Sequence, residues 1–512
     1  MQAYIPSIWA MSDIGAIADV VAGGTPKAGD KSNFSSPGAG FAWLTPADLS
    51  GYTEKYISRG SRDLSEKGLT TSSAKLMPAG SLLFSSRAPI GYVAIAANEI
   101  STNQGFKNFV FTNEIVPTYA YFYLKSIREL ADRLGTGTTF KEISGATAKT
   151  LPFVIPPFAE QKEIADRLDK LLAQVEATQA RLAKIPDVIK QFRQSVLTAA
   201  MNGKLTETWR EYNKCISDDL VSKIKMARFK LWKEWQLDEF SAKGKTPKGH
   251  WESKYSEPVR NISIENLPVS WSCLSWNEIS TWITYGFTKP MPHVDSGPLI
   301  ITAKNVRDGV VEFDNVHRTT IEAFSSLRPK DKPTAGDILI VKDGATTGRA
   351  SIAPATLEEY CISQSVAVVW LKYCPINRKF LLWNVQSQET QKKIKEVMAG
   401  MAMPHLSITD FGRMLVPIPP SDEIEEIVRR VEQLFAYADS IEQQVKAAKE
   451  RVDNLTQAIL AKAFRGELTA DWRAANPELI SGENSAAALL EKIKAERQAE
   501  KAKKKTAVRK KI

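Results

Sequence analysis

Cysteine and histidine are scarce in this sequence, with only four of each among 512 residues. The cysteines are widely spaced and form no Cys-x-x-Cys pair, so neither a disulfide framework nor a zinc site is indicated. The histidines stand alone, without the Ser, Cys or Asp motif that would indicate a nucleophilic catalytic triad. The residues concerned are Cys215, Cys273, Cys361 and Cys374, and His250, His293, His317 and His405.

Long apolar runs are absent as well. The first 24 residues contain no Lys or Arg, and apolar runs such as Tyr92–Ala97 are far shorter than the ~18 residues that a membrane span needs. The chain is 43% apolar, which is enough for real cores, and its length allows several ordinary domains. We therefore expect a soluble, globular protein in the cytoplasm.

Complete catalytic motifs are also missing. Ile155–Phe158 has the Pro-Pro-aromatic ending found in amino-group DNA methyltransferases, but an isoleucine stands where a polar acceptor is needed. Glu160–Lys162 has the Glu-x-Lys spacing of metal-dependent nucleases, yet it lies at an expected helix start and becomes Glu423–Glu425 in the repeat described below. We interpret that spacing as coincidence. Gly244–Thr246 ends like a phosphate-binding loop, but Glu239 stands where the leading glycine should be. The chain itself is predicted to catalyse nothing.

Positive charge is present in excess, but it is concentrated in one place. The formal net charge is +10, and residues 492–512 hold ten Lys and Arg against two Glu. Such a tail is typical of a solvated, partly disordered extension, although it could add salt-sensitive phosphate contacts. The net charge alone therefore does not indicate nucleic-acid binding.

The sequence contains two copies of one plan. Residues 203–210 read GKLTETWR and residues 466–473 read GELTADWR, and the same offset of 263 places Pro156–Pro157 on Pro419–Pro420. Positions kept between the halves serve what the halves share, and positions that differ serve what each half does alone. This internal comparison indicates a tandem protein.

The segments that follow these motifs match each other too. Leu220–Arg228 (LVSKIKMAR) resembles Leu489–Arg497 (LLEKIKAER). The middle linker and the C-terminal tail are therefore equivalent. We expect the tail to pack near the first globular block as the linker packs near the second, in a cyclic arrangement.

Apolar residues in steps of three and four predict one long coiled-coil helix in each half. They are Ile164, Leu168, Leu171, Val175, Leu182, Ile185, Ile189, Phe192 and Val196, with Thr178 in the gap, and Ile427, Val431, Leu434, Ala438, Ile441, Val445, Ala448, Val452, Leu455 and Ile459. About 40 residues at ~1.5 Å rise make each helix about 60 Å long, and the two copies can pair antiparallel with each other. Pro186 interrupts only the first copy, where we expect a kink or a local restart.

The blocks before the helices are rich in Gly, Pro, Ser and Thr and contain short β-type runs, which indicates compact mixed domains. The runs include Ser81–Phe84, Tyr92–Ile95, Ile338–Val341 and Val366–Trp370. The predicted fold class is α+β, with two mixed α/β domains separated by two long antiparallel coiled-coil helices in a pseudo-two-fold tandem repeat. The expected segments are a first domain (1–150), a first spacer helix region (151–210), a linker with a helix (211–265), a second domain (266–413), a second spacer helix region (414–473) and a basic helical tail (474–512).

A combination of motifs resembles the specificity subunits of type I restriction-modification enzymes. The motifs are Gly23–Pro26, Trp43–Leu49, Phe84–Gly91, Thr102–Phe106 and Leu151–Lys162, and the likeness covers the first 473 residues. The resemblance implies two target-recognition domains that each read one half of a split DNA site and are held apart by two helices. It also implies two modification (methyltransferase) subunits and motor-nuclease restriction subunits as partners. S-adenosylmethionine, ATP and Mg²⁺ would belong to those partners, and this subunit would be non-catalytic.

Two equivalent strand exits differ in charge between the halves. Phe84–Arg87 stands where the second copy has Ile340–Asp343, so a potential guanine donor, Arg87, in one block corresponds to a potential cytosine acceptor, Asp343, in the other. Contacts to phosphate alone, or surface ion pairs, explain these residues equally well. Trp43 is expected in the core, and the shared Gln104 and Gln364 are expected to serve the framework.

Further candidates come from loops and from the repeated Trp-Arg turns. The DNA-binding candidates are Thr25, Lys27, Ser85, Arg87, Asn103, Lys107, Tyr285, Thr288, Lys289, Lys342, Asp343, Thr346, Thr347 and Arg349. The candidates for binding a partner subunit are Trp209, Arg210, Trp472 and Arg473. No metal-binding residue is predicted.

Two other functions remain open on the sequence alone. The heptads and the nearly neutral globular blocks also fit a coiled-coil adaptor that does not bind specific DNA sequences. A self-sufficient DNA enzyme with unrecognised motifs is the third possibility, and methyl transfer by the chain alone would reveal it.

Overall fold

The computed structural model describes residues 5–87, 89–137, 141–213, 219–257, 264–356 and 358–509, except for the side chains of residues 501 and 503–509. The chain forms two compact units, of which unit 1 is Met1–Ala183 with Lys446–Ile512 and unit 2 is Lys184–Val445. Cys215 and the last three residues of the basic tail lie outside the described residues. None of the described helices is both long and apolar enough to cross a membrane.

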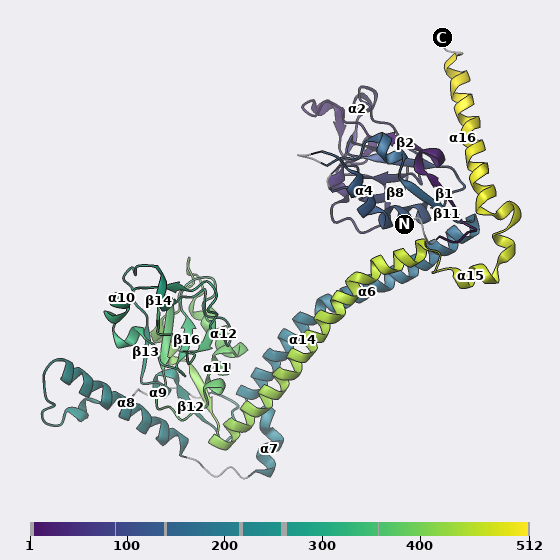
Figure 1. Cartoon of the computed structure of the whole chain (residues 1–512). Coiled ribbons are helices and arrows are strands. Elements are labelled where there is room, and N and C mark those ends of the chain that lie inside the picture. The colour runs from purple at the N-terminus through teal and green to yellow at the C-terminus, as the bar shows by residue number, and fades with distance from the viewer. Residues whose placement is uncertain are drawn as a thin grey trace. The chain divides into compact units, whose positions relative to one another are not determined.

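Unit 1 contains a mixed domain built on two sheets (Figure 1). The five-stranded sheet has the order β2 (Ala18–Ala22), β10 (Lys107–Phe111), β7 (Leu82–Phe84), β8 (Val93–Ala96) and β5 (Tyr56–Ile57), in which only β5 and β8 pair in parallel. The four-stranded sheet has the order β3 (Phe34–Ser35), β6 (Arg62–Leu64), β4 (Phe41–Leu44) and β9 (Ser101–Thr102). A separate antiparallel pair joins β1 (Ala10–Asp13) to β11 (Pro152–Ile155). The helices of this domain are α1 (Ile14–Ile17), α2 (Glu66–Thr70), α3 (Pro117–Ser126), α4 (Arg128–Leu134) and α5 (Gly145–Lys149).

Unit 2 repeats the plan with different details. Its four-stranded antiparallel sheet has the order β13 (Trp282–Tyr285), β19 (Val366–Trp370), β16 (Ile338–Val341) and β17 (Ala350–Ile352). A three-stranded sheet has the order β15 (His317–Arg318), β14 (Val294–Ile301) and β18 (Tyr360–Ile362), and β12 (Ser272–Ser275) pairs with β20 (Leu415–Ile418). The helices of the second domain are α9 (Trp276–Ile279), α10 (Ile321–Ser325), α11 (Arg378–Gln386), α12 (Gln388–Val397) and α13 (Ile408–Arg413).

The four predicted β-type runs are confirmed as strands β7, β8, β16 and β19. Strands β7 and β16 are buried along their whole length. This burial explains why both read as continuous apolar runs and lack the polar alternation of a half-exposed strand. Trp43 is buried, as expected, and its indole Nε1 donates to the Gly24 carbonyl (3.1 Å).

Each domain packs its core against the long helices. In unit 1 the rings of Tyr119 and Tyr123 on α3 lie 5.7 and 5.1 Å from the ring of Phe464. In unit 2 the ring of Trp383 on α11 lies 5.9 Å from that of Phe435. Aromatic side chains bury large apolar areas. The equivalent helices α3 and α11 therefore attach each domain to the segment of the long helices in its own unit.

The two long helices are α6 (Phe158–Met201) and α14 (Ser421–Phe464). In unit 1, Gln179 on α6 donates to Asp453 on α14 (2.9 Å), and Arg167 donates to Asp471 beyond the end of α14 (2.8 Å). Residue numbers thus rise along one helix as they fall along the other. The antiparallel pairing is confirmed.

The same antiparallel order holds for the helix segments of unit 2. Arg193 on α6 bonds to Asp439 on α14, and Arg430 donates to the carbonyl of Leu205 just beyond α6 (2.8 Å). Of the two expectations at Pro186, a kink or a local restart, the restart is absent, because α6 continues through this residue, and the kink stays a prediction. A proline inside a helix removes one backbone hydrogen bond, and the packed neighbouring helix keeps the chain helical.

Two residues of the predicted seam between the helices are exposed. Thr178 and Leu455 lie on the surface, whereas Ile164, Leu168 and Val431 are buried as expected. A helix drifts by about 20° per heptad from a strict 3.5-residue repeat. Over so long a pair, a strict heptad pattern therefore assigns some exposed positions to the seam.

The C-terminal tail packs on unit 1 through its first turns. In α16 (Ala486–Arg509), Leu489 and Ile493 are buried in the unit 1 core, and Arg497 donates to Asp19 (3.0 Å). Lys492 also forms an ion pair with Glu114 (2.6 Å). The prediction of a solvated extension is therefore wrong for this part of the tail, because its apolar residues share one helical face that the domain covers.

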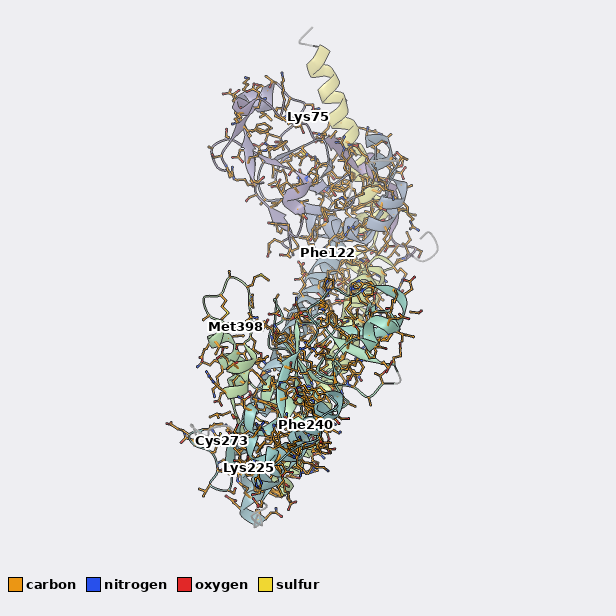
Figure 2. The ribbon with its side chains drawn as sticks, turned by 90° about the vertical axis from the view of Figure 1, so that its left-hand side faces the viewer. Lys75, Phe122, Lys225, Phe240, Cys273 and Met398 are labelled. Carbon is orange, nitrogen blue, oxygen red and sulfur yellow. The ribbon has the colours of Figure 1, made fainter. Side chains whose placement is uncertain are left out.

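The middle linker packs on unit 2 in the same way. In α8 (Leu220–Ala242), Leu220 and Ile224 are buried in the unit 2 core, and Arg228 donates to the carbonyl of Ser280 (3.1 Å). The predicted equivalence of linker and tail is confirmed. Lys225 and Phe240, both on α8, are labelled in Figure 2.

Candidate nucleic-acid interface and the repeated anchor

A buried polar cluster joins the elements of unit 1, and we call it the first anchor. The Glu160 carboxylate at the start of α6 is 0% exposed. It accepts hydrogen bonds from Trp9 Nε1 (2.7 Å), Thr469 Oγ1 (2.7 Å) and Arg473 Nη1 (2.6 Å). Arg473 also donates Nη2 to the carbonyl of Gly466 (2.5 Å). The carboxylate is thus paired and hydrogen-bonded, which is the condition for burying a charge without a large penalty.

The second anchor is the same cluster in unit 2. The Glu423 carboxylate at the start of α14 is 0% exposed and accepts from Trp271 Nε1 (2.8 Å), Thr206 Oγ1 (2.6 Å) and Arg210 Nη1. Arg210 donates Nη2 to the carbonyl of Gly203 (2.6 Å). Each anchor therefore ties three distant segments of its unit together.

The two anchor glycines cannot carry a side chain. Gly203 and Gly466 have φ angles of +79° and +77°, in the left-handed region that favours glycine. A Cβ atom on Gly203 would lie 2.5 Å from Pro268 Cγ, and one on Gly466 would lie 2.3 Å from Pro6 Cγ. These contacts explain the glycine that opens both copies of the repeated motif.

The anchors change the interpretation of the partner-binding candidates. Arg210 and Arg473 are bound to buried carboxylates, so their guanidinium groups are not free to contact a partner. The prediction is wrong for these two residues, because the left-handed glycine turns the chain back toward the start of the facing helix. Trp209 and Trp472 are half-buried, and their role stays a prediction.

The sequence did contain a signal for the anchors. Glu160 corresponds to Glu423 at the offset of 263, and Trp9 corresponds to Trp271 at an offset of 262. Glu160 belongs to the Glu-x-Lys spacing that we interpret as coincidence, but the glutamate itself is kept between the halves. Testing each kept polar residue for a shared structural role would have identified the cluster.

In the first domain, Arg87 and Lys107 share one carboxylate. Arg87 donates Nε to Glu142 Oε2 (2.8 Å), and Lys107 Nζ lies 3.2 Å from Glu142 Oε1. Lys107 is only 8% exposed, whereas the Arg87 side chain is 45% exposed. Burial alone would raise the pKa of Glu142, but the hydrogen bonds from Arg87 and Lys107 outweigh it and lower that pKa. Glu142 therefore stays ionised and holds Arg87 at the surface.

In the second domain, Lys342 and His405 share one carboxylate. Lys342 Nζ lies 2.6 Å from Asp343 Oδ2, and His405 Nδ1 lies 2.6 Å from Asp343 Oδ1. The Lys342 ammonium also lies 5.0 Å from the centre of the Tyr285 ring, as expected for a cation–π contact. Burial alone would raise the pKa of Asp343, but the hydrogen bonds from Lys342 and His405 lower it.

Three further candidates form hydrogen bonds that hold loops of the first domain in place. Ser85 is buried, and its hydroxyl donates to the Pro89 carbonyl and accepts from the Tyr92 amide (both 2.8 Å). The structure thus assigns Ser85 to the loop interior and corrects its prediction as a DNA contact. Asn103 Oδ1 accepts from the Gly105 amide (2.9 Å), and Thr25 bonds to Gln104.

The remaining loop candidates lie at the surface. Lys27, Thr288 and Lys289 are exposed. The structure therefore leaves them accessible to a ligand, and their DNA contacts stay predictions.

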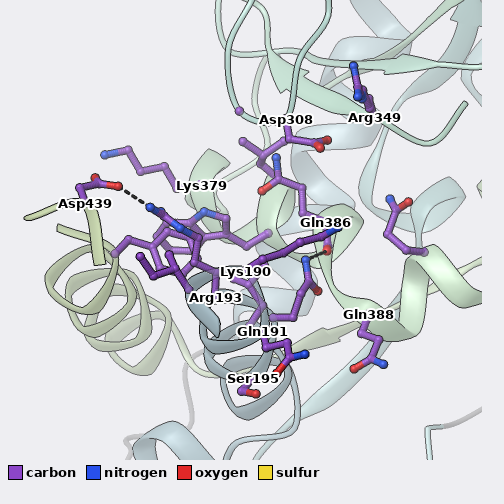
Figure 3. Close-up of a pocket in the computed structure, with 18 of the residues that line it drawn as sticks. Lys190, Gln191, Arg193, Ser195, Asp308, Arg349, Lys379, Gln386, Gln388 and Asp439 are labelled. Atoms are coloured by element: carbon purple, nitrogen blue, oxygen red, sulfur yellow. Dashed lines mark hydrogen bonds and ion pairs between the residues drawn. The ribbon is translucent and has the colours of Figure 1, made fainter. Parts of the chain in front are cut away.

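Thr346, Thr347 and Arg349 line an open cleft of about 1750 Å³ in unit 2, between the second domain and the long helices (Figure 3). Six basic and five acidic side chains line it, so its charges largely balance. Arg193 bonds to Asp439 across the helix pair, as Figure 3 shows. The cleft thus offers both signs of charge and does not define one ligand by itself.

The described residues contain no group of three His, Cys, Asp or Glu side chains that could hold a metal ion. The arrangement instead offers two scaffolds with the same anchors and with different polar groups at equivalent exposed loops. Such a design suits a protein whose two domains contact two different ligand surfaces through a shared framework.

Comparison with known proteins shows the family to which this two-domain protein belongs. The model of the family described as type I restriction modification DNA specificity domain matches residues 6–187 and 295–451. The chain belongs to this family of DNA specificity subunits of type I restriction-modification systems. This finding confirms the resemblance seen in the sequence motifs.

Individual relatives agree with the family. The chain is 38% identical to the type I restriction enzyme EcoBI specificity subunit of Escherichia coli, over 71% of this chain and 68% of that protein. It is 39% identical to the EcoKI specificity subunit of Escherichia coli K12, over 74% of this chain and 71% of that protein. The crystal structure of the HsdS subunit from Thermoanaerobacter tengcongensis has a TM-score of 0.54 and 17% identity, and the match covers 91% of this chain and 99% of that one. This last likeness shows a shared fold.

Proposed function

We propose that the chain recognises a bipartite, asymmetric DNA site, with each mixed domain reading one half. The observation that carries this proposal is the contrast within the repeat. The anchors are the same in both units, whereas the exposed loop at one equivalent position presents Arg87 and Glu142 in one domain and Asp343 and His405 in the other. Different hydrogen-bonding groups on the same framework suit two different base sequences.

We further propose that the chain acts as a non-catalytic scaffold. Two modification (methyltransferase) subunits and motor-nuclease restriction subunits would assemble on it. S-adenosylmethionine, ATP and Mg²⁺ would bind to those partners. The repeated helix ends around Trp209 and Trp472 offer two equivalent surfaces, which supports two copies of one partner.

A complex of this chain with a modification subunit should contain two copies of that subunit for each copy of the chain. The reason is that each anchor builds the same helix end, so one docking surface occurs twice. Native mass spectrometry of the co-purified complex gives the ratio directly. A complex that stays at one-to-one with the modification subunit in excess would contradict the scaffold proposal.

A coiled-coil adaptor without sequence-specific DNA binding is the alternative function. Membership of the DNA specificity family counts against it. Salt-dependent binding of the reconstituted complex to duplex DNA, with preference for one sequence, would exclude the adaptor.

A further inference from the structure

The ion pairs Arg87–Glu142 and Asp343–His405 occupy the same place in the two domains. Arg87 and Glu142 form an isolated antiparallel bridge, and Asp343 and His405 form another. Glu142 and His405 correspond at the offset of 263 that aligns the halves. In both cases a strand exit meets a second loop, but the acidic and basic partners have exchanged loops.

Neighbouring backbone bonds support this equivalence. The Ile143 amide donates to the Ser86 carbonyl (2.9 Å), and the Leu406 amide donates to the Lys342 carbonyl (2.8 Å). In each domain the residue that follows Glu142 or His405 donates to the residue that precedes Arg87 or Asp343. The loops are held by the same backbone contacts, so the exchange concerns only the side chains.

In the first domain the Glu142 carboxylate positions Arg87 through Nε and leaves the two Nη groups of Arg87 without a bond to it. Glu142 accepts from Nε of Arg87, and no hydrogen bond from either Nη to a described residue is found. The two Nη groups form a fork that matches O6 and N7 of guanine. Glu142 therefore acts as a positioning residue.

In the second domain both oxygens of the carboxylate are engaged within the protein. Asp343 accepts from His405 through one oxygen and from Lys342 through the other. The His405 side chain is 52% exposed, and only its Nδ1 is engaged among the described residues. The more exposed group at this position is therefore the imidazole, whose Nε2 faces outward, whereas the Asp343 side chain is 33% exposed and holds the imidazole in place. Direct reading of a base by Asp343 is the alternative.

We propose that His405 reads a base in the second half-site, that Asp343 positions it, and that His405 stands in the place that Arg87 occupies in the first domain. This inference rests on the proposed DNA-recognition function. A single ring nitrogen can contact only one atom of a base edge, whereas the guanidinium fork contacts two. The second domain should therefore discriminate less strongly at its position than the first domain does at the position read by Arg87.

The test uses the full chain assembled with its modification subunits. Methyl transfer is measured as kcat/KM on duplexes that carry the methylated site of the parent complex, with each base pair of each half-site replaced in turn. The variants are His405→Ala, His405→Gln, Asp343→Asn and Arg87→Ala. His250→Ala removes an exposed histidine of the linker and serves as the matched control. Thermal unfolding of every variant shows whether it is folded, and His405→Gln provides a less disruptive replacement.

Arg87→Ala should reduce discrimination at one position of one half-site by about 5- to 150-fold, the range expected for loss of a bidentate base contact. His405→Ala and His405→Gln should relax one position of the other half-site by a smaller factor. Asp343→Asn should relax that same position, because the imidazole loses its positioning partner. His250→Ala should match the parent.

Four results would overturn the inference. His405→Ala could lower kcat/KM equally on all duplexes, which would make the residue a phosphate contact. Asp343→Asn could change the preferred base at a position that His405→Ala leaves unaltered, which would make Asp343 the reader. Unchanged preference in all folded variants would also overturn it. A parent complex with no sequence preference would instead overturn the proposed function, and this inference with it.

Discussion

Replacing Glu423 by alanine is expected to lower the free energy of unfolding of unit 2 by about 3 to 5 kcal/mol, the cost of removing one partner from a buried charge pair. Three donors converge on this carboxylate: Trp271, Thr206 and Arg210. Without Glu423 the guanidinium of Arg210 loses its counter-ion and the buried donors lose their acceptor. Urea unfolding monitored by tryptophan fluorescence measures the loss, since Trp271 lies in the cluster.

Glu450→Ala is the matched control for this prediction. Glu450 lies on the same helix, in the part that belongs to unit 1, is exposed, and should change the free energy of unfolding of unit 2 by less than about 0.5 kcal/mol. Glu160→Ala should have a similar effect to Glu423→Ala, but on unit 1. If Glu423→Ala unfolds at the same urea concentration as Glu450→Ala, the anchor does not hold the unit together.

Inserting one heptad into each long helix is expected to lengthen the gap between the two half-sites by about three base pairs. Seven residues at ~1.5 Å rise add about 10 Å to the helical pair, and one base pair spans about 3.4 Å. The insertions belong between Ile185 and Ile189 and between Ala448 and Val452. A whole heptad keeps the apolar seam in register, so the pair should still form.

The half-site sequences should stay those of the parent, because the domains are untouched. A heptad added to α6 alone is the control, since it puts the two helices out of register and should reduce assembly or methylation. Sequencing of methylated bases in a host that carries the modification subunit gives both the gap and the half-sites. A folded, active double-insertion variant that keeps the parental gap would show that the helices do not set the spacing.

Much of the fold could be predicted from the repeat and from hydrophobic spacing. The strands β7 and β16, the antiparallel long helices and the packed linker all follow from patterns that local physics explains. Pro186 shows a limit of this reasoning. A residue that breaks an isolated helix can remain inside one that is packed along its length, and single-residue propensity does not include that packing.

The candidate site could be predicted only in part. The sequence placed Arg87 and Asp343 at equivalent positions, but it could not show that His405, 62 residues beyond Asp343, bonds to it. Nor could it show that Ser85 points inward or that Arg473 binds Glu160, because these contacts depend on how distant segments pack. Charge differences between repeats thus locate a variable loop, whereas the outward-facing atom is known only from the structure.

We propose that each mixed domain reads its own half of a bipartite site. The most direct test replaces residues 1–150 with the corresponding block of a homologous chain and maps the methylated sites in a host that supplies the modification subunit. We expect one half-site to change to the sequence read by the donor block, while the other half-site and the gap stay the same. A change in both half-sites, or in neither, would contradict it.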